Sequence, residues 1–291
     1  MRAGTSSSYQ FLDTDAGASE AAGLLSGATP GGHFDVWNAS FQQQLANGSV
    51  PALNYITLPI DHTLGTTPGI PTPRAFVADN DLALGQFVEA ISHSSIWPQT
   101  AIFVVEDDSQ DGADHVDSHR SPALVISPWA RQGAVVHTRY DQYSMLRTLE
   151  LILGLDPLAL NDALATPMYD TFISGSEKPN NAPYNVVAPS YPITAVNTAS
   201  AADAKLSKQL PWDRLDLVPQ LVMDRILWHS VYGEASPPPA AGPDASPIEH
   251  QRALGVLDVL AHGGDARAWL LAHSAGGESL PTPGAQVRGS G

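Results

Sequence analysis

The stretch from residue 100 to 130 constrains the fold most, because it places a dense acidic segment between two short apolar runs. The first run, 101–105, and the second, 123–127, are rich in apolar and β-branched residues, which predicts two buried strands. The carboxylates and histidines between them are Glu106, Asp107, Asp108, Asp111, Asp114, His115, Asp117 and His119. Like charges at this density repel unless they are solvated, protonated or neutralised by cations. We therefore expect a metal site on this segment.

The order of the predicted elements indicates an α/β fold, with a mainly parallel sheet flanked by helices. The alternating segment 53–58 predicts a further strand, and apolar periodicity or length predicts helices over 37–46, 77–94, 140–153 and 217–232. Asp61 and Asp107 each follow a predicted strand. In a parallel sheet both would lie at the carboxyl ends of the strands, on one edge. Residues distant in sequence are thus expected to meet there.

The chain is expected to have four parts. An irregular, partly helical segment spans 1–50, and a core with the metal loop spans 51–173. An extended wrap and C-terminal helices follow at 174–273, and a disordered tail at 274–291. Residues 1–30 and the tail contain much Gly, Ser and Pro and few apolar anchors, so we expect them to be poorly anchored.

Charge and composition exclude several classes of protein. The 291 residues carry a formal net charge of −16, which repels nucleic acid and anionic lipid and favours cations. The absence of Cys excludes disulfides and thiolate metal sites. No apolar run approaches the roughly 18 residues of a membrane span. The N-terminal stretch also lacks the apolar region of a signal peptide. The oligomeric state is left open.

Two familiar metal motifs fail on inspection. The segment beginning at Asp107 matches the first half of an EF-hand loop, but Ser118 stands at the twelfth position, where a bidentate Glu is needed. His115 and His119 have the spacing of a zinc-protease helix, but Val116 stands where the Glu base is required. The acidic segment therefore predicts a site of another kind, with a solvated acidic turn as the alternative.

Other candidate residues lie close to these carboxylates. Asp61 and His62 form an Asp-His pair, which is common in loops and gains significance here from its position at the end of a predicted strand. Arg74 and Arg120 lie near the candidate ligands. An exposed Arg is usually a surface residue, but beside a metal site its guanidinium can hold a phosphate oxygen through a bidentate bond.

Four motifs together resemble a known superfamily. They are LPIDHTLGT at 58–66, VADNDLALGQFVEAISHSSIW at 77–97, TAIFVVEDDSQDGADHVDSHRSPALVISPWARQGAV at 100–135 and YDQYSMLRTLELILGL at 140–155. Residues 54 to about 172 resemble the alkaline-phosphatase-like superfamily, in its bacterial phosphoesterase branch with phospholipase C and acid phosphatases. The resemblance implies an alkaline-phosphatase-like fold and metal-dependent hydrolysis of a small-molecule or lipid phosphate ester.

The resemblance also implies roles for single residues. Asp61 and His62 match the Asp/His pair after its strand, Asp107 and Asp108 match the pair at the next strand end, and His119 matches the late His. His115 is a further candidate ligand. The ions implied are Zn²⁺, Mn²⁺, Ca²⁺ or Mg²⁺, without a choice between them. A periplasmic or secreted location is implied by the resemblance alone.

One departure from the superfamily affects the expected activity. Its first strand, with a metal ligand and a Thr or Ser nucleophile, lies well upstream of the Asp-His pair, and no segment here matches it. Thr63 and Thr66 adjoin the pair but do not occupy the nucleophile position. The chain thus resembles the C-terminal part of a larger enzyme. We expect it to bind a divalent cation and to hydrolyse phosphate esters feebly or not at all. The alternative is a non-catalytic, metal-stabilised binding or scaffold module.

Overall fold

The structure is a computed structural model that describes residues 33–58, 61, 63–106, 121–212, 218 and 220–236. The chain divides into two compact units, unit 1 with residues 1–64 and 71–196 and unit 2 with residues 65–70 and 197–291. The described elements are α2 (His33–Asn47), α3 (Pro73–Ser92), η2 (Trp97–Gln99), β1 (Ile102–Val105), β2 (Ala123–Ile126), α4 (Gln142–Leu153), α5 (Leu160–Leu164) and η3 (Tyr169–Thr171) in unit 1, and α6 (Ala204–Ser207) and α7 (Gln220–Tyr232) in unit 2. The predicted helices at 37–46, 77–94, 140–153 and 217–232 correspond to α2, α3, α4 and α7.

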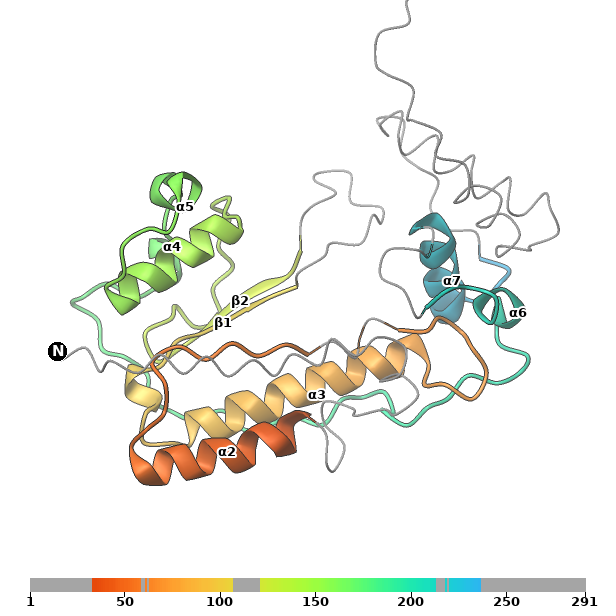
Figure 1. The fold of residues 1–291 in the computed structure, drawn as a ribbon, viewed down its shortest axis with the longest axis horizontal. Coiled ribbons are helices and arrows are strands. Elements are labelled where there is room, and N and C mark those ends of the chain that lie inside the picture. The colour runs from red at the N-terminus through yellow and green to blue at the C-terminus, as the bar shows by residue number, and fades with distance from the viewer. Residues whose placement is uncertain are drawn as a thin grey trace, which may run out of the picture. The chain divides into compact units, whose positions relative to one another are not determined.

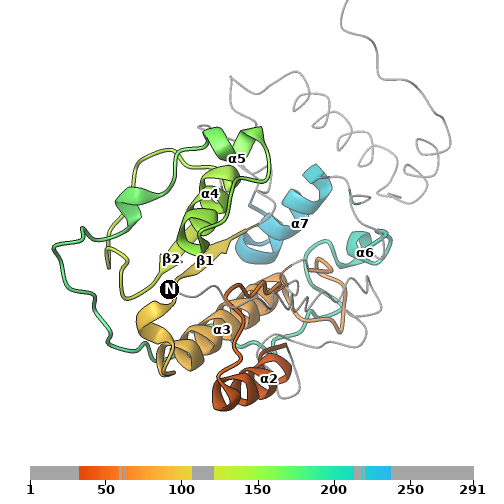
Figure 2. The same cartoon turned by 60° about the vertical axis from the view of Figure 1, so that its left-hand side comes forward.

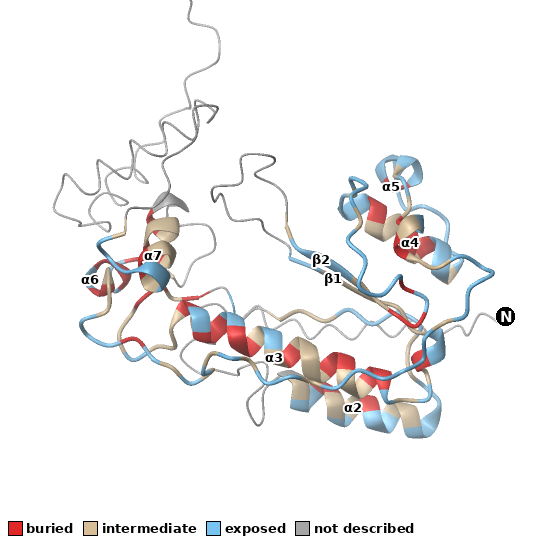
Figure 3. Cartoon of the chain, turned by 180° about the vertical axis from the view of Figure 1, so that it is seen from behind, coloured by how far each residue is buried: buried red, intermediate tan, exposed pale blue. Residues whose placement is uncertain are grey.

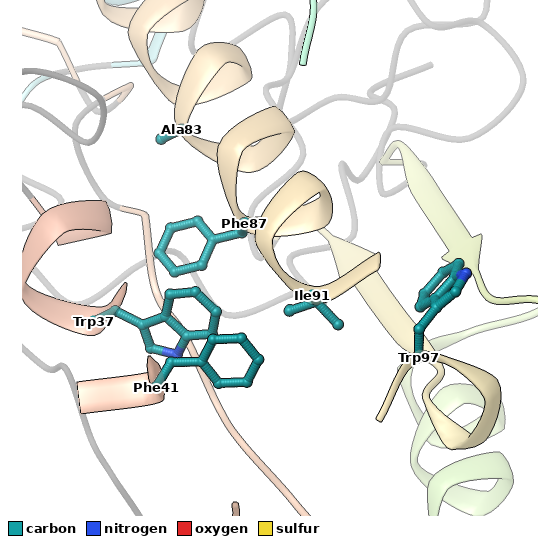
Figure 4. Packing of buried hydrophobic residues seen from close by; sticks show 6 residues of the cluster. All are labelled: Trp37, Phe41, Ala83, Phe87, Ile91 and Trp97. Atoms are coloured by element: carbon teal, nitrogen blue, oxygen red, sulfur yellow. The ribbon is translucent and has the colours of Figure 1, made fainter. Parts of the chain in front are cut away.

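The core of unit 1 lies between α2 and α3 and is largely aromatic (Figure 4). On α3, Ala83, Phe87 and Ile91 recur every four residues, so they share one face of the helix. On α2, Trp37 and Phe41 stack with ring centroids 4.4 Å apart, and the Trp37 ring lies 4.6 Å from that of Phe87. The sequence predicts an apolar stripe on this helix from Leu84, Phe87, Val88 and Ile91, and the structure places Phe87 and Ile91 in this core.

The two described strands pair as an antiparallel hairpin, which contradicts the predicted parallel sheet. Ile102 lies opposite Ile126, and Val105 lies opposite Ala123. Antiparallel neighbours need only a loop between them, whereas parallel neighbours need a crossover that is usually helical. Residues 106–122 were predicted as a loop, and a loop fits the antiparallel pairing. Only the coarser prediction, a mixture of helices and strands, is confirmed.

Residues 53–58, predicted as a third strand, form no strand in the described structure. Ile56 and Leu58 pack against the aromatic core instead. The Leu58 carbonyl accepts a hydrogen bond of 2.8 Å from the side-chain amide of Asn80 on α3. The segment is thus held by a side chain and by apolar packing rather than by a neighbouring strand.

Helix α4 forms where its sequence predicts, but its buried face is a different one. The Asp141 side chain caps the first turn, and Gly154 ends the helix with φ 70°, a conformation that glycine adopts without strain. The buried residues of the helix are Ser144, Thr148 and Glu150. The apolar residues that recur at helical spacing along α4, which the sequence predicts to share one face, are only partly buried or exposed. They are Met145, Leu146, Leu149, Ile152 and Leu153.

Within unit 1, Figures 1 and 2 show the β1–β2 hairpin between the α2–α3 pair and the α4–α5 pair. Figure 3 shows buried residues on the adjoining faces of α2 and α3, and mostly exposed residues on α5. The segment 174–203 contains no helix or strand, as expected for a wrap. None of the described helices has both the length and the apolar character that crossing a membrane would require.

Unit 2 has its own small core, in which Leu206, Leu210, Val222 and Ile226 pack with Trp212. Gly65 has φ 57°, and a β-carbon there would lie 2.8 Å from both the Ser207 hydroxyl and the Trp212 ring. Only glycine fits this position, because both the backbone conformation and the space exclude a side chain. The Asp203 carboxylate joins α6 to α7 by accepting from Arg225 at 3.0 Å and contacting His229 Nδ1 at 2.5 Å.

The expectations for 1–30, for short helices over 250–262 and 266–273, and for the tail 274–291 lie outside the described residues.

Candidate functional site

Of the residues predicted from the sequence to form the site, the structure describes Asp61 and Arg74. The remaining candidates, His62, Asp107, Asp108, His115, His119 and Arg120, lie outside the described residues. The structure therefore describes three parts of the candidate site: the chain on either side of the acidic segment, the position of Asp61, and the surroundings of Arg74.

The acidic segment begins and ends at one place, at the loop end of the β1–β2 hairpin. The Glu106 N–H donates to the Pro122 carbonyl at 3.3 Å. The Ser121 hydroxyl donates to the Glu106 carbonyl at 3.1 Å. These bonds continue the pairing of Val105 with Ala123. Five carboxylates and both histidines of the segment thus lie on a stretch of chain whose two ends are held together.

Asp61 is exposed, and the backbone next to it is unusual. Thr63 is buried and has φ 56°. A β-branched residue rarely adopts this left-handed conformation, because its branched side chain crowds the backbone. Such strain persists only where the surrounding structure imposes it, and it occurs preferentially at functional sites. The loop that carries Asp61 is therefore a reasonable part of a site.

One end of unit 1 is reached by three parts of the chain, which are segment 50–58, β1 and α3. In Figures 1 and 3 the segment 50–58 and β1 run in the same direction, so the chain leaves both at one end. Helix α3 begins at that end too. The first turn of a helix carries partial positive charge and stabilises anions.

Arg74 lies in the first turn of α3 and is exposed. Its guanidinium carbon lies 4.5 Å from the centroid of the Tyr191 ring, a distance at which a cation is attracted to the ring face. Among the residues that the structure describes, no carboxylate forms an ion pair with Arg74. The side chain is therefore oriented by an aromatic ring and not neutralised by a described acid.

Thr66, one of the two threonines beside the Asp-His pair, has a structural role in unit 2. It is buried, and its hydroxyl donates to the Ala202 carbonyl at 2.6 Å. The same oxygen lies 3.0 Å from the Ser207 hydroxyl. A hydroxyl enclosed by these partners is not presented to a substrate, so the structure gives no support to Thr66 as a nucleophile.

The residues around Arg74 include two that the sequence reasoning missed. Thr72 caps α3, and its side chain accepts from the Ala75 N–H at 3.1 Å. The Thr72-Pro73 pair is a helix-start signal, and it would have placed the helix start at 73 rather than 77. Tyr191 has no such signal, because it reaches Arg74 from a segment more than a hundred residues away in sequence.

The described residues contain no group of three or more His, Asp or Glu side chains that could hold a metal ion. Asp61 alone cannot form a site. The ligand set of Asp61, His62, Asp107, Asp108, His115 and His119 accordingly stays a prediction.

Residues 31–156 match the family described as the Phosphoesterase family. The match covers less than half of the chain and includes Asp61, Arg74, the acidic segment and all of α4. It agrees with the resemblance seen in the sequence and, at a coarse level, suggests hydrolysis of phosphate esters. No curated protein matches the chain.

Proposed function

We propose that this chain takes part in the metal-dependent hydrolysis of a phosphate ester, either a small molecule or a lipid. The observation that carries the proposal is the Phosphoesterase family match, because it contains every residue that the sequence nominates for the site. The net charge of −16 agrees with a cation-binding protein and disfavours nucleic acid as the substrate.

The geometry of unit 1 supports the same site. The acidic segment is closed at its ends by the hydrogen bonds between residues 106 and 121–122. The segment leading to Asp61, the end of β1 and the start of α3 occupy one end of the unit (Figure 1). A phosphate at that end would find the positive end of α3 and the Arg74 side chain within the same region.

The proposed ligands of a divalent cation, Zn²⁺, Mn²⁺, Ca²⁺ or Mg²⁺, are Asp61, His62, Asp107, Asp108 and His119, with His115 as a further candidate. When bound, such an ion withdraws charge from the phosphoryl oxygens and lowers the pKa of a bound hydroxyl or water. The part of Arg74 and Arg120 is to donate hydrogen bonds to the phosphoryl oxygens and orient the ester. A periplasmic or secreted location stays a prediction from the resemblance.

The test is hydrolysis of 4-nitrophenyl phosphate by the full chain, before and after removal of divalent ions with a chelator. We expect slow turnover that the chelator abolishes and that one of the four ions restores. Asp107→Asn should lower both the affinity for that ion and the turnover, the latter by a factor of about 10² or more, because a lost ligand disturbs the whole site. Calorimetric titration with Mn²⁺ and Zn²⁺ measures the affinity.

Asp114→Asn is the matched control, because it removes the same charge from the same acidic segment at a position not proposed as a ligand. Equal effects of the two substitutions would show that the segment acts only through its total charge. Metal binding without any turnover would favour the non-catalytic, metal-stabilised module. Turnover that is indifferent to the chelator would refute the metal-dependent mechanism.

A further inference from the structure

The Arg74 side chain is held by an aromatic residue that is distant from it in sequence. Tyr191 belongs to the irregular segment 174–203, yet its ring lies under the Arg74 guanidinium at 4.5 Å. Stacking on an aromatic face restricts the rotamers of an arginine and leaves the donors along its planar edge free for an acceptor. In a chain of net charge −16, an exposed arginine with no described carboxylate partner is well suited to bind an external anion.

Tyr191 is itself fixed by several contacts with the start of α3. Its hydroxyl lies 3.1 Å from the Thr72 hydroxyl, which also caps the helix through the Ala75 N–H. The Thr72 N–H donates to the Ala195 carbonyl at 2.8 Å, and Pro71 forms an isolated antiparallel bridge with Val196. These contacts hold residues 191–196 against residues 71–72, so the ring cannot leave the guanidinium without losing its hydroxyl contact with Thr72.

The position of this pair connects it with the proposed site. Arg74 lies in the first turn of a 20-residue helix, where the helix dipole favours a negatively charged ligand. Helix α3 begins at the end of unit 1 toward which the chain leads from segment 50–58 and from β1 (Figure 3). An anion held by Arg74 would therefore lie at the end of unit 1 where segment 50–58 and β1 end.

We propose that Tyr191 is a positioning residue for Arg74: its ring and its bond to Thr72 hold the guanidinium ready to bind a phosphoryl oxygen of the substrate. This inference rests on the proposed function for the identity of the anion. Tyr191 does not contact the substrate and acts only through Arg74. Thr72 fixes the Tyr191 ring relative to the start of α3 through the contact between their hydroxyl groups.

The experiment is a titration of the full chain with inorganic phosphate, followed by calorimetry, for the wild type and a double-mutant cycle. Arg74→Gln should weaken phosphate binding about tenfold or more, because the charged donor is lost. Tyr191→Leu should weaken it about two- to fivefold, the ratio expected for an exposed cation–aromatic contact. Tyr191→Phe keeps the ring and should recover most of that loss.

Coupling decides whether Tyr191 acts through Arg74. In the Arg74→Gln background, Tyr191→Leu should have no further effect on phosphate affinity. The matched control is Tyr184→Leu, a tyrosine of the same irregular segment that packs edge-on against Trp97 and stacks on no arginine of the described chain. It should leave phosphate affinity unchanged. If Tyr191→Leu fails to fold, Arg74→Lys replaces it: the charge is kept, the planar stack is lost, and affinity should still fall.

The inference fails if the wild-type chain binds no phosphate, if Tyr191→Leu behaves like Tyr184→Leu, or if the losses at Arg74 and Tyr191 simply add. Failure of the proposed function looks different. A chain that binds phosphate with the expected coupling but never hydrolyses 4-nitrophenyl phosphate would retain the Arg74–Tyr191 pair as an anion site and lose the enzymatic assignment.

Discussion

The two helix pairs of unit 1 are held together in opposite ways. Helices α2 and α3 bury an aromatic core, whereas α4 and α5 bury polar groups, and the leucines of α5 and of the α4–α5 connection are exposed. The exposed fractions are 80% for Leu158, 71% for Leu160 and 75% for Leu164. Apolar spacing is therefore a sound guide to which residues share a face. It does not determine whether another element covers that face.

The α4–α5 connection is organised by two buried carboxylates. The Asp162 side chain accepts from the Leu158 N–H at 2.6 Å and from the Ala159 N–H at 2.8 Å. The Glu150 side chain lies 3.3 Å from the same Leu158 N–H, and accepts from Arg147 at 3.1 Å. Asp162 thus satisfies the backbone donors at the start of α5, a part that an apolar side chain could not play.

The largest effect is expected in the aromatic core. Phe87→Ala removes a ring that packs on Trp37, and it should lower the free energy of unfolding by about 3–5 kcal/mol through lost burial and the cavity left behind. Chemical denaturation monitored by tryptophan fluorescence measures the change. Val77→Ala, at an exposed position of the same helix, is the control and should cost at most about 0.5 kcal/mol. A loss below about 1 kcal/mol for Phe87→Ala would mean that the two helix pairs do not differ as described.

A smaller effect, with a distinct pH signature, is expected at Asp162. Burial raises the pKa of this carboxyl. The hydrogen bonds from the N–H groups of Leu158 and Ala159, together with the neighbouring Glu150 side chain, more than offset burial and hold the pKa below its ordinary value. A carboxyl with a lowered pKa stabilises the fold above its unfolded pKa, about 3.9, and that stability is lost as the pH falls through the folded pKa.

The measurement is thermal unfolding between pH 7 and pH 2. Wild type should be more stable than Asp162→Asn at pH 6, and the difference in Tm should shrink once the pH falls below about 4. Asp156→Asn is the control, because Asp156 has no hydrogen-bond partner in the described part of the chain. It should preserve the wild-type pH dependence. A constant difference between wild type and Asp162→Asn across this range would show that Asp162 is not the titrating group.

Local signals in the sequence predicted most of the helices correctly. The Asn47-Gly48 stop, the stripe of α3 and the Gly154 cap all act within a few residues, so their effect could be inferred without the fold. Strand pairing could not, because it depends on contacts between distant segments. The strand predicted over 53–58 failed for that reason: Asn80, more than twenty residues away, supplies the partner that a neighbouring strand was expected to provide.

The candidate site shows the same contrast between local signals, which the sequence reveals, and contacts between distant segments, which it does not. The sequence located the acidic segment and Arg74, because charge density and residue type are visible in a linear chain. It did not predict that the ends of the acidic segment are joined through Glu106 and Ser121, or that Tyr191 supports Arg74. Both contacts depend on how the chain folds back on itself, and neither changes the local composition.

The smallest effect is expected on the exposed leucines, and it is the sharpest test of the comparison. Leu164→Ser removes an apolar side chain from a surface in contact with water, so little burial is lost and the free energy of unfolding should stay within about 0.5 kcal/mol of wild type.

The matched buried position is Leu206 in unit 2, where the same substitution should be costly because the side chain is buried among apolar neighbours. Denaturant unfolding of both variants at several protein concentrations shows whether the leucines are uncovered, covered by a second copy or covered by the chain itself.

A loss of unfolding free energy above about 1 kcal/mol at Leu164 that grows with protein concentration would show that a second copy covers the leucines. A loss of that size independent of concentration would show that the chain itself covers them. Either outcome would mean that α4–α5 is stabilised by apolar burial after all, as α2–α3 is. An unchanged stability would support the view that Asp162 and Glu150 hold this helix pair without the exposed leucines.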